Sequence, residues 1–313
     1  TTSTPAEDFF AAASLAWDLS VNVVGSATHG VGDRIGTLGR LAKNIAPQLT
    51  RLSRLADIRS GTRENIGLAV QRRALEFPDD TFFLFEGRAH SYHAADVRVD
   101  NIVRGLLECG VRHGQHVGLY METRPSAVAA TIALSRLGAV AVLLRPDISL
   151  PKQLATARVE HLLTDPERGE TAYENFGSSV LVLGGGGDAR TLASGQIDME
   201  AIDPDKVEVP EWYKPNPGLA GELAIVLITG DENHLGASRV TNRRWATSAY
   251  GTATSCALTP HDTVYCCSPV HHPTGILVCV GGALVSGARL AMATEFTSTI
   301  NPSVFWQDAR RYG

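Results

Sequence analysis

A strand–helix–strand pattern in the middle of the sequence constrains the fold most strongly. Residues 125–137 are rich in small residues and lie between two short apolar runs, 116–121 and 139–144. Apolar runs joined by a helix in this way predict a βαβ unit, whose parallel strands are buried on both faces. Two further apolar runs, 162–164 and 180–183, can extend the same sheet. We therefore expect an α/β protein with mostly parallel sheets flanked by helices.

Composition narrows the classes of function. The chain has 313 residues, of which 44% are hydrophobic and 19% charged, and its formal net charge is −5. This length suffices for a sizeable core, and the negative charge argues against nucleic acid as a partner. We see no apolar run long enough to span a bilayer and no secretory signal, so we expect a cytoplasmic protein. Because the sequence starts at Thr1 and stops at Gly313 just after a helical pattern, we also expect further chain beyond Gly313.

The cysteines give no sign of a metal site. They are odd in number, show no C-x-x-C spacing, and are Cys109, Cys256, Cys266, Cys267 and Cys279. We interpret them as buried thiols in a reducing compartment. The neighbouring histidines His271 and His272 point apart on most backbones, and the sequence offers them no obvious third ligand. We therefore predict no metal centre, and expect one of these histidines to line a binding pocket.

The first 64 residues differ in character from the rest and are predicted to form a helical, basic amphipathic extension. Residues 31–63 carry seven arginines and lysines against two aspartates, and leucines recur between them at spacings of three and four. One interpretation is a helix that lies on an anionic membrane surface. The other is a helix that packs on its own domain with solvated arginines. The regular strand and helix pattern begins after this segment, so residues 65–313 form the second predicted domain.

The stretch from Glu222 to Trp245 is the best candidate for a binding loop. Residues 223–228 form an apolar run typical of a buried strand, and residues 229–236 form a polar, glycine-bounded loop. A loop that leaves a buried strand with unpaired N–H groups is suited to binding polyphosphate. An ordinary loop between two strands is the alternative. A second glycine-rich run, 184–189, has the form G-x-G-x-x-A, but no clear helix or acidic residue follows at the spacing of a dinucleotide site.

From about residue 65 to residue 313, the chain resembles the large N-terminal domain of the adenylate-forming, or AMP-binding, superfamily. Within it, the chain is most similar to mycobacterial long-chain fatty-acyl-CoA synthetases. The resemblance rests on the order and spacing of several segments, which are residues 83–146, VTNRRW at 240–245, SPVHHPTGI at 268–276, GGALVSGARLAMATEF at 281–296 and FWQDARRYG at 305–313. It implies part of the adenylate-forming N-terminal domain.

The resemblance also implies an activity. Members activate a carboxylate with ATP and Mg²⁺ to an acyl-adenylate, and then transfer the acyl group to CoA; here the expected substrate is a long-chain fatty acid. The loop from 229 to 239 corresponds to the family's phosphate loop, which implies nucleotide contacts by Thr229, Gly230, Asn233, Gly236, Ser238 and Arg239. His272 corresponds to the histidine beside the acyl-binding tunnel, and Gly275 closes its turn. The sequence identifies no catalytic residue.

The phosphate loop departs from the family pattern. Gly236 occupies the place of the family's lysine, and Asp231 and Glu232 stand where hydroxyl groups are usual. Carboxylates near a triphosphate oppose its binding by about 1–4 kcal/mol each, and Arg239 could supply the missing positive charge. The family's ribose-binding acid and its late lysine also fall beyond Gly313, so we expect this chain alone to be inactive. The alternative is a non-catalytic acyl-binding or scaffold module with a degenerate loop.

Overall fold

The computed structural model describes residues 48–185, 191–293 and 302–312. The chain divides into two compact units, residues 1–57 and 58–313. In the first unit residues 48–57 are helical. The helical pattern at 7–24 and residues 31–47 of the basic segment lie outside the described residues.

A seven-stranded sheet forms the larger half of the second unit. Its order is β7-β6-β5-β3-β4-β8-β9, and every neighbouring pair is parallel except the hairpin of β8 and β9. The strands are β3 (His116–Tyr120), β4 (Val140–Leu143), β5 (His161–Thr164), β6 (Val180–Val182), β7 (Gln196–Asp198), β8 (Leu223–Gly230) and β9 (Leu235–Thr241). The parallel order confirms the predicted α/β fold.

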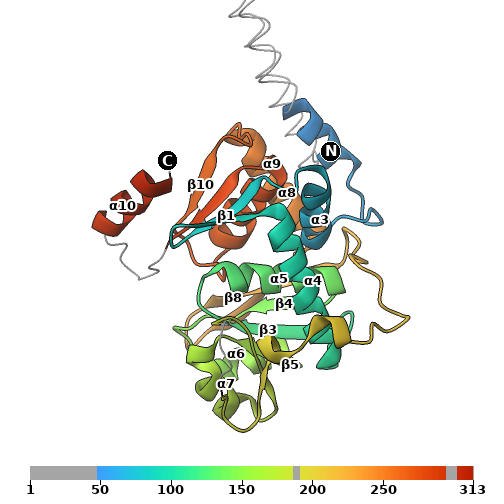
Figure 1. The fold of residues 1–313 in the computed structure, drawn as a ribbon, viewed down its shortest axis with the longest axis vertical. Coiled ribbons are helices and arrows are strands. Elements are labelled where there is room, and N and C mark those ends of the chain that lie inside the picture. The colour runs from blue at the N-terminus through green and yellow to red at the C-terminus, as the bar shows by residue number, and fades with distance from the viewer. Residues whose placement is uncertain (1–47, 186–190, 294–301, 313) are drawn as a thin grey trace, which may run out of the picture. The chain divides into compact units, whose positions relative to one another are not determined.

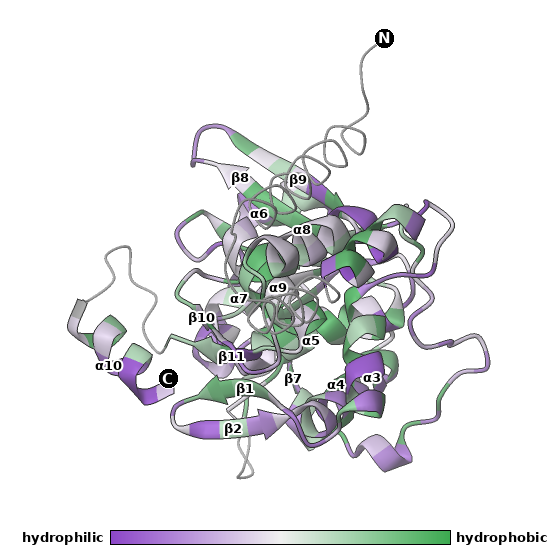
Figure 2. Cartoon of the chain, turned by 90° about the horizontal axis from the view of Figure 1, so that it is seen from above, coloured by the Kyte–Doolittle hydropathy of each residue, from purple (hydrophilic) through white to green (hydrophobic). Residues whose placement is uncertain are grey.

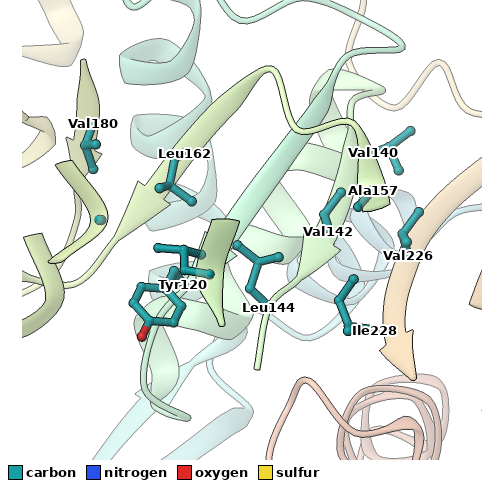
Figure 3. Packing of buried hydrophobic residues seen from close by; sticks show 11 residues of the cluster. Tyr120, Val140, Val142, Leu144, Ala157, Leu162, Val180, Val226 and Ile228 are labelled. Atoms are coloured by element: carbon teal, nitrogen blue, oxygen red, sulfur yellow. The ribbon is translucent and has the colours of Figure 1, made fainter. Parts of the chain in front are cut away.

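Helices cover both faces of this sheet (Figure 1). Helices α4 (Tyr92–Glu108) and α5 (Pro125–Leu137) lie on one side, and α6 (Leu150–Ala157) and α7 (Gly169–Phe176) lie on the other. On the second side, side chains from β3, β4, β5 and β8 pack together under α6, as Figure 3 shows for Tyr120, Leu144, Leu162 and Ile228. Burial on both faces explains why these strands read as continuous apolar runs.

A four-stranded sheet with the order β10-β11-β1-β2 forms the smaller half. Its strands are β1 (Thr81–Phe85), β2 (Arg88–Ser91), β10 (Thr263–Cys266) and β11 (Arg289–Met292). Figure 2 shows that β1 is largely hydrophobic and that the edge strand β2 is mostly hydrophilic. The remaining helices are α3 (Ile66–Glu76), α8 (Asn242–Ser255), a π-helix (Thr274–Val280), α9 (Gly281–Ser286) and α10 (Pro302–Tyr312).

A buried arginine joins three of the helices. Arg136 on α5 is 0% exposed and ion-pairs with Asp96 and Asp100 of α4. Its Nη2 also donates to the carbonyl oxygen of Gly67 on α3, at 3.4 Å. A buried charge is tolerated only where it is paired in this way, so the cluster fixes how α3, α4 and α5 meet.

Several short elements were not predicted from the sequence. Helix α5 was predicted at its observed bounds. Helices α3, α6 and α7 and the strand β7 were missed. Both α6 and α7 have only eight residues, too few to establish a helical period against the background of loop residues.

Candidate functional site

The predicted phosphate loop is a tight hairpin turn at the carboxyl end of β8. Strand pairing continues through Thr229–Gly236 and Gly230–Leu235, so the turn consists of residues 231–234 and is shorter than the predicted loop. Gly230 has a φ of +88°, and a Cβ there would lie 1.9 Å from the carbonyl oxygen of His234. Only glycine fits this position, which explains why the chain reverses here.

The side chain of Asp231 bonds to the backbone of its own turn. Its Oδ1 accepts the backbone N–H groups of Asn233 and His234, each at 2.9 Å. These bonds lower the pKa of Asp231, because they favour the ionised carboxylate. Two N–H groups at the tip of the turn are therefore already engaged by a carboxylate of the turn itself.

Glu232 holds the turn against the segment that follows β4. Its Oε1 accepts the N–H of Ser149 at 2.5 Å, and the Nζ of Lys152 donates to its carbonyl oxygen at 2.9 Å. The same ammonium lies 3.2 Å from the Glu232 Oε2. Beside it, the Nη1 of Arg145 donates to the carbonyl oxygen of Gly230 at 2.8 Å. The turn is thus tied to the start of α6 through charged groups.

The other residues predicted for the loop lie along the hairpin. Thr229 and Gly236 face each other next to the turn, whereas Ser238 and Arg239 pair with Leu227 and Val226 further down the strands. At about 3.3 Å per residue, Arg239 lies roughly 13 Å along β9 from its first residue. It lines a cavity of about 530 Å³ near the amino end of β3, together with His116, Arg158 and Glu160. The structure does not bring Arg239 to the turn.

The two neighbouring histidines have different environments. His272 is exposed, and its Nδ1 accepts the N–H of Thr274 at 3.2 Å. His271 is more buried, and this burial lowers its pKa to about 4. Gly275 is buried at the start of the π-helix, where a Cβ would lie 2.1 Å from the carbonyl oxygen of Pro269.

The segment that carries His271 lies beside the carboxyl end of β3, since the N–H of Val270 donates to the Oγ1 of Thr123 at 3.1 Å. The charges that act on the imidazole of His271 include Asp147 and Arg145, which are ion-paired to each other at 2.6 Å. Both residues follow β4, whereas His271 belongs to the segment after β10. This turn of the smaller half therefore lies against the carboxyl edge of the seven-stranded sheet, where ligands bind in open α/β folds.

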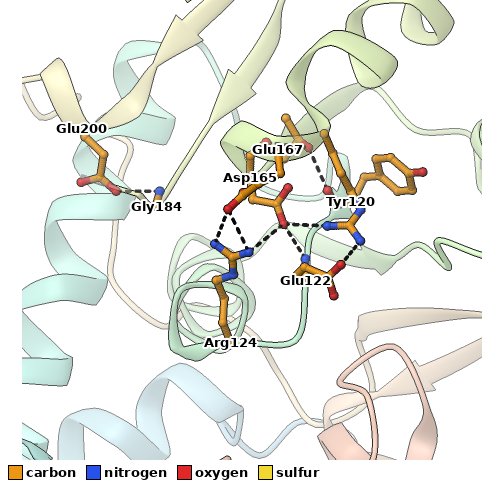
Figure 4. A network of polar contacts seen from close by, with 9 residues as sticks. Tyr120, Glu122, Arg124, Asp165, Glu167, Gly184 and Glu200 are labelled. Atoms are coloured by element: carbon orange, nitrogen blue, oxygen red, sulfur yellow. Dashed lines mark hydrogen bonds and ion pairs between the residues drawn. The ribbon is translucent and has the colours of Figure 1, made fainter. Parts of the chain in front are cut away.

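A polar cluster that the sequence reasoning missed occupies the switch point of this sheet. The chain proceeds from β3 to β4 on one side and then returns to β5 on the other. At the adjoining strand ends, the buried Asp165 accepts the N–H of Glu122 at 2.6 Å and the Nη1 of Arg168 at 3.0 Å (Figure 4). Arg168 also ion-pairs with Glu122, and Arg124 lies 3.9 Å from Asp165.

Opposing effects act on the pKa of Asp165, and the pKa is raised overall. Burial raises its pKa, while the N–H of Glu122 and the guanidinium groups of Arg168 and Arg124 lower it in part. Its Oδ1 is buried and has no hydrogen-bond partner among the described residues. The signal for this cluster is visible in the sequence as acidic and basic residues that directly follow two strands, but the adjacency of β3 and β5 is not.

The second glycine-rich run lies at the end of β6. The N–H of Gly184 donates to the Oε1 of Glu200 at 2.8 Å (Figure 4). Glu200 also ion-pairs with Arg98. Residues 186–190 lie outside the described residues, and residues 191–195 lead directly into β7. In the described part of the chain, no group of three His, Cys, Asp or Glu side chains could hold a metal ion.

Comparison with known proteins shows which enzymes the chain is similar to. Residues 70–212, which include β3 to β6 and the switch-point cluster, match the family model of the AMP-binding enzymes. Over these residues the chain is similar to the AMP-binding enzymes. The chain is 25% identical over 256 residues to long-chain fatty acid transport protein 2 of Rattus norvegicus, covering 77% of this chain and 39% of that protein. It is also 25% identical over 270 residues to a medium/long-chain-fatty-acid–CoA ligase of Mycobacterium tuberculosis, covering 80% and 41%.

Solved structures share the fold of this chain. A protein of Rhodopseudomonas palustris, solved as a candidate long-chain-fatty-acid CoA ligase, superposes with a TM-score of 0.66 at 14% identity, covering 79% of this chain and 61% of that one. The o-succinylbenzoate CoA synthetase of Bacillus subtilis, in complex with its acyl-adenylate intermediate, gives a TM-score of 0.59 at 19% identity, covering 78% and 59%. The chain spans about two fifths of the length of the curated relatives named above.

Proposed function

We propose that this chain is the N-terminal part of a fatty-acyl-CoA synthetase, which activates a long-chain fatty acid with ATP to an acyl-adenylate for transfer to CoA. The observation that carries the proposal is the position of the β8–β9 turn. In an AMP-binding domain with fatty-acid ligases among its relatives, this turn lies at the carboxyl edge of the sheet, with Lys152 and Arg145 beside it. Displacement at phosphorus depends mainly on positioning and charge stabilisation, which such groups supply.

The proposed substrate contacts follow from this placement. Thr229, Gly230, Asn233 and Gly236 form the turn and its flanks, where the phosphates of ATP would lie. Ser238 and Arg239 stand further along β9, so their predicted nucleotide contacts need a ligand that extends along the strand. His272 and Gly275 would border the fatty acid on the other side of the crevice. Mg²⁺ would be held chiefly by the phosphate oxygens of ATP, as is usual for this ion.

Because the chain spans about two fifths of its curated relatives, we propose that it does not complete the reaction by itself. A second function is favoured by one specific observation, namely that Asp231 and Glu232 already engage the donors of the turn. On that basis the domain would be a non-catalytic module that binds an acyl group without ATP.

Calorimetry separates these two functions. Mg·ATP is titrated into the protein first, and palmitate is titrated into the same sample afterwards. Binding of both ligands, with palmitate binding tighter after ATP, is expected for the synthetase. Palmitate binding of equal strength with and without ATP would favour the acyl-binding module. Failure to bind palmitate under either condition would exclude both.

We further propose that the protein is cytoplasmic and that the basic segment 31–63 contacts anionic membrane surfaces. In the part of the chain that the structure describes, no helix is long and apolar enough to cross a membrane. Clustered arginines and lysines next to an amphipathic helix bind anionic lipid headgroups. Co-sedimentation with phosphatidylserine vesicles tests this, and equal sedimentation with phosphatidylcholine vesicles would count against it.

A further inference from the structure

The β8–β9 turn contains two kinds of group that a polyphosphate would otherwise use. Polyphosphate binding at a loop requires backbone N–H donors and cationic side chains that are free to turn toward the ligand. Here the N–H groups of Asn233 and His234 donate to the carboxylate of Asp231. The turn has formed around an anion that is part of its own sequence.

Lys152, a cation beside the turn, is also bonded to a carboxylate of the turn. The Nζ of Lys152 donates both to the Glu232 carbonyl oxygen and to its carboxylate. The N–H of Ser149 and the ammonium of Lys152 lower the pKa of Glu232, so its carboxylate is ionised at neutral pH. The negative charge of Glu232 therefore lies where a bound phosphate would need a positive charge.

A third contact ties the turn to the chain that follows β4. Arg145 donates to the carbonyl oxygen of Gly230 through Nη1, while its Nε and Nη2 bond to Asp147. The turn is thus fixed to residues 145–152 at two points, at Gly230 just before the turn and at Glu232 within it. All of these groups are at least partly exposed to solvent, so each bond is individually weak and can be exchanged.

We propose that Asp231 and Glu232 form an internal latch, in which the domain's own carboxylates occupy the donors of the phosphate loop and Glu232 sets the affinity for polyphosphate. The latch rests on the proposed function, because it assumes that this turn faces the phosphates of ATP. Mg·ATP binds only after the Glu232 carboxylate has left Ser149 and Lys152, and its negative charge opposes the ligand even then. Removing that charge therefore raises the affinity for Mg·ATP.

The test uses the full chain and calorimetric titration with Mg·ATP and, separately, with inorganic tripolyphosphate. Glu232→Gln is expected to bind both ligands about five- to tenfold more tightly than the unchanged protein. Adding Asp231→Asn should strengthen binding further. Glu211→Gln removes the same charge from an exposed site outside the turn and should leave both affinities unchanged. Equal affinities for Glu232→Gln and Glu211→Gln would overturn the latch.

Amide hydrogen exchange supplies a readout that needs no ligand. Slow exchange at Ser149, Asn233 and His234 is expected in the unchanged protein. Glu232→Asp keeps the charge but shortens the side chain, so it should speed exchange at Ser149 alone. Asp231→Asn should speed exchange at Asn233 and His234, and so should lowering the pH to protonate Asp231, which occurs below the usual range of an aspartate. Unchanged exchange in these variants would also overturn the proposal.

Binding of palmitate to the same samples distinguishes a failure of the latch from a failure of the proposed function. If palmitate binds but Glu232→Gln gains no affinity for Mg·ATP, the latch is wrong and the proposed function stands. If palmitate does not bind while Glu232→Gln does gain affinity for tripolyphosphate, the latch is supported and the fatty-acid substrate is wrong.

Discussion

Two ion clusters in this chain contain the same kinds of side chain but differ in burial. At the junction of α3, α4 and α5, the guanidinium of Arg136 is fully buried between Asp96 and Asp100. Beside the β8–β9 turn, the side chains of Lys152 and Glu232 remain 55% and 47% exposed. Water cannot reach the guanidinium of Arg136 to replace a lost partner, whereas water replaces a lost partner in the second cluster. The first cluster can therefore only hold the scaffold together, and the second can exchange a carboxylate for a ligand.

The largest expected effect comes from breaking the buried cluster. Arg136→Ala leaves a space between three helices where a fully buried side chain was, and it leaves the partly buried Asp96 unpaired, so we expect a loss of about 3–5 kcal/mol in the free energy of unfolding. Lys152→Ala is the matched change in the exposed cluster and should cost less than about 1 kcal/mol. Urea denaturation of both variants measures the difference. Equal losses would show that burial does not separate the two clusters.

A smaller effect is expected at His271, which is less buried than Arg136 and more buried than Lys152. Its folded-state pKa of about 4 is below the ordinary value near 6.5, so the native state favours the neutral imidazole. The resulting stability is present above about pH 6.5 and is lost as the pH falls toward 4. We expect His271→Gln to remove a pH dependence on the order of 2–3 kcal/mol across that window.

Thermal unfolding at pH 7 and pH 4.5 measures the effect at His271. His272→Gln is the control, because His272 is exposed on the same turn, and it should retain the pH dependence of the unchanged protein. If His271→Gln and His272→Gln behave alike, burial of His271 is not the cause of the pH dependence.

The same contrast explains what the sequence could and could not predict. Burial on both faces makes the strands of the large sheet continuous apolar runs, so β3, α5 and β4 were predicted close to their observed bounds. The pairing of β3 with β5 depends on tertiary packing, so the cluster around Asp165 was missed even though its residues follow the strands. The sequence places Asp231 and Glu232 in the loop and predicts repulsion of phosphate. In the structure these carboxylates bond instead to the turn's own N–H groups and to the start of α6. These bonds depend on the short turn at residues 231–234, and the sequence pattern predicted a longer loop.

The smallest expected effect tests whether the exposed cluster faces a nucleotide. Gly236 lies opposite Thr229 beside the turn, and a Cβ there would meet only the Thr229 Oγ1, at 2.9 Å. Because the Thr229 side chain is at the surface and can rotate, Gly236→Lys should fold and place a cation next to the turn. We expect about tenfold tighter binding of Mg·ATP by calorimetry, equivalent to roughly 1.4 kcal/mol.

Gly61→Lys adds the same charge at an exposed position where a Cβ would meet nothing within 4 Å, and it should leave the affinity unchanged. The new lysine at position 236 can also pair with Glu232 instead of with phosphate. The gain should therefore be larger when Gly236→Lys is combined with Glu232→Gln than the two separate gains together, which a double-mutant cycle measures. Unchanged affinity in both the single and the combined variant would place the nucleotide phosphates away from this turn, and the exposed cluster would then be only a structural tie between β8 and α6.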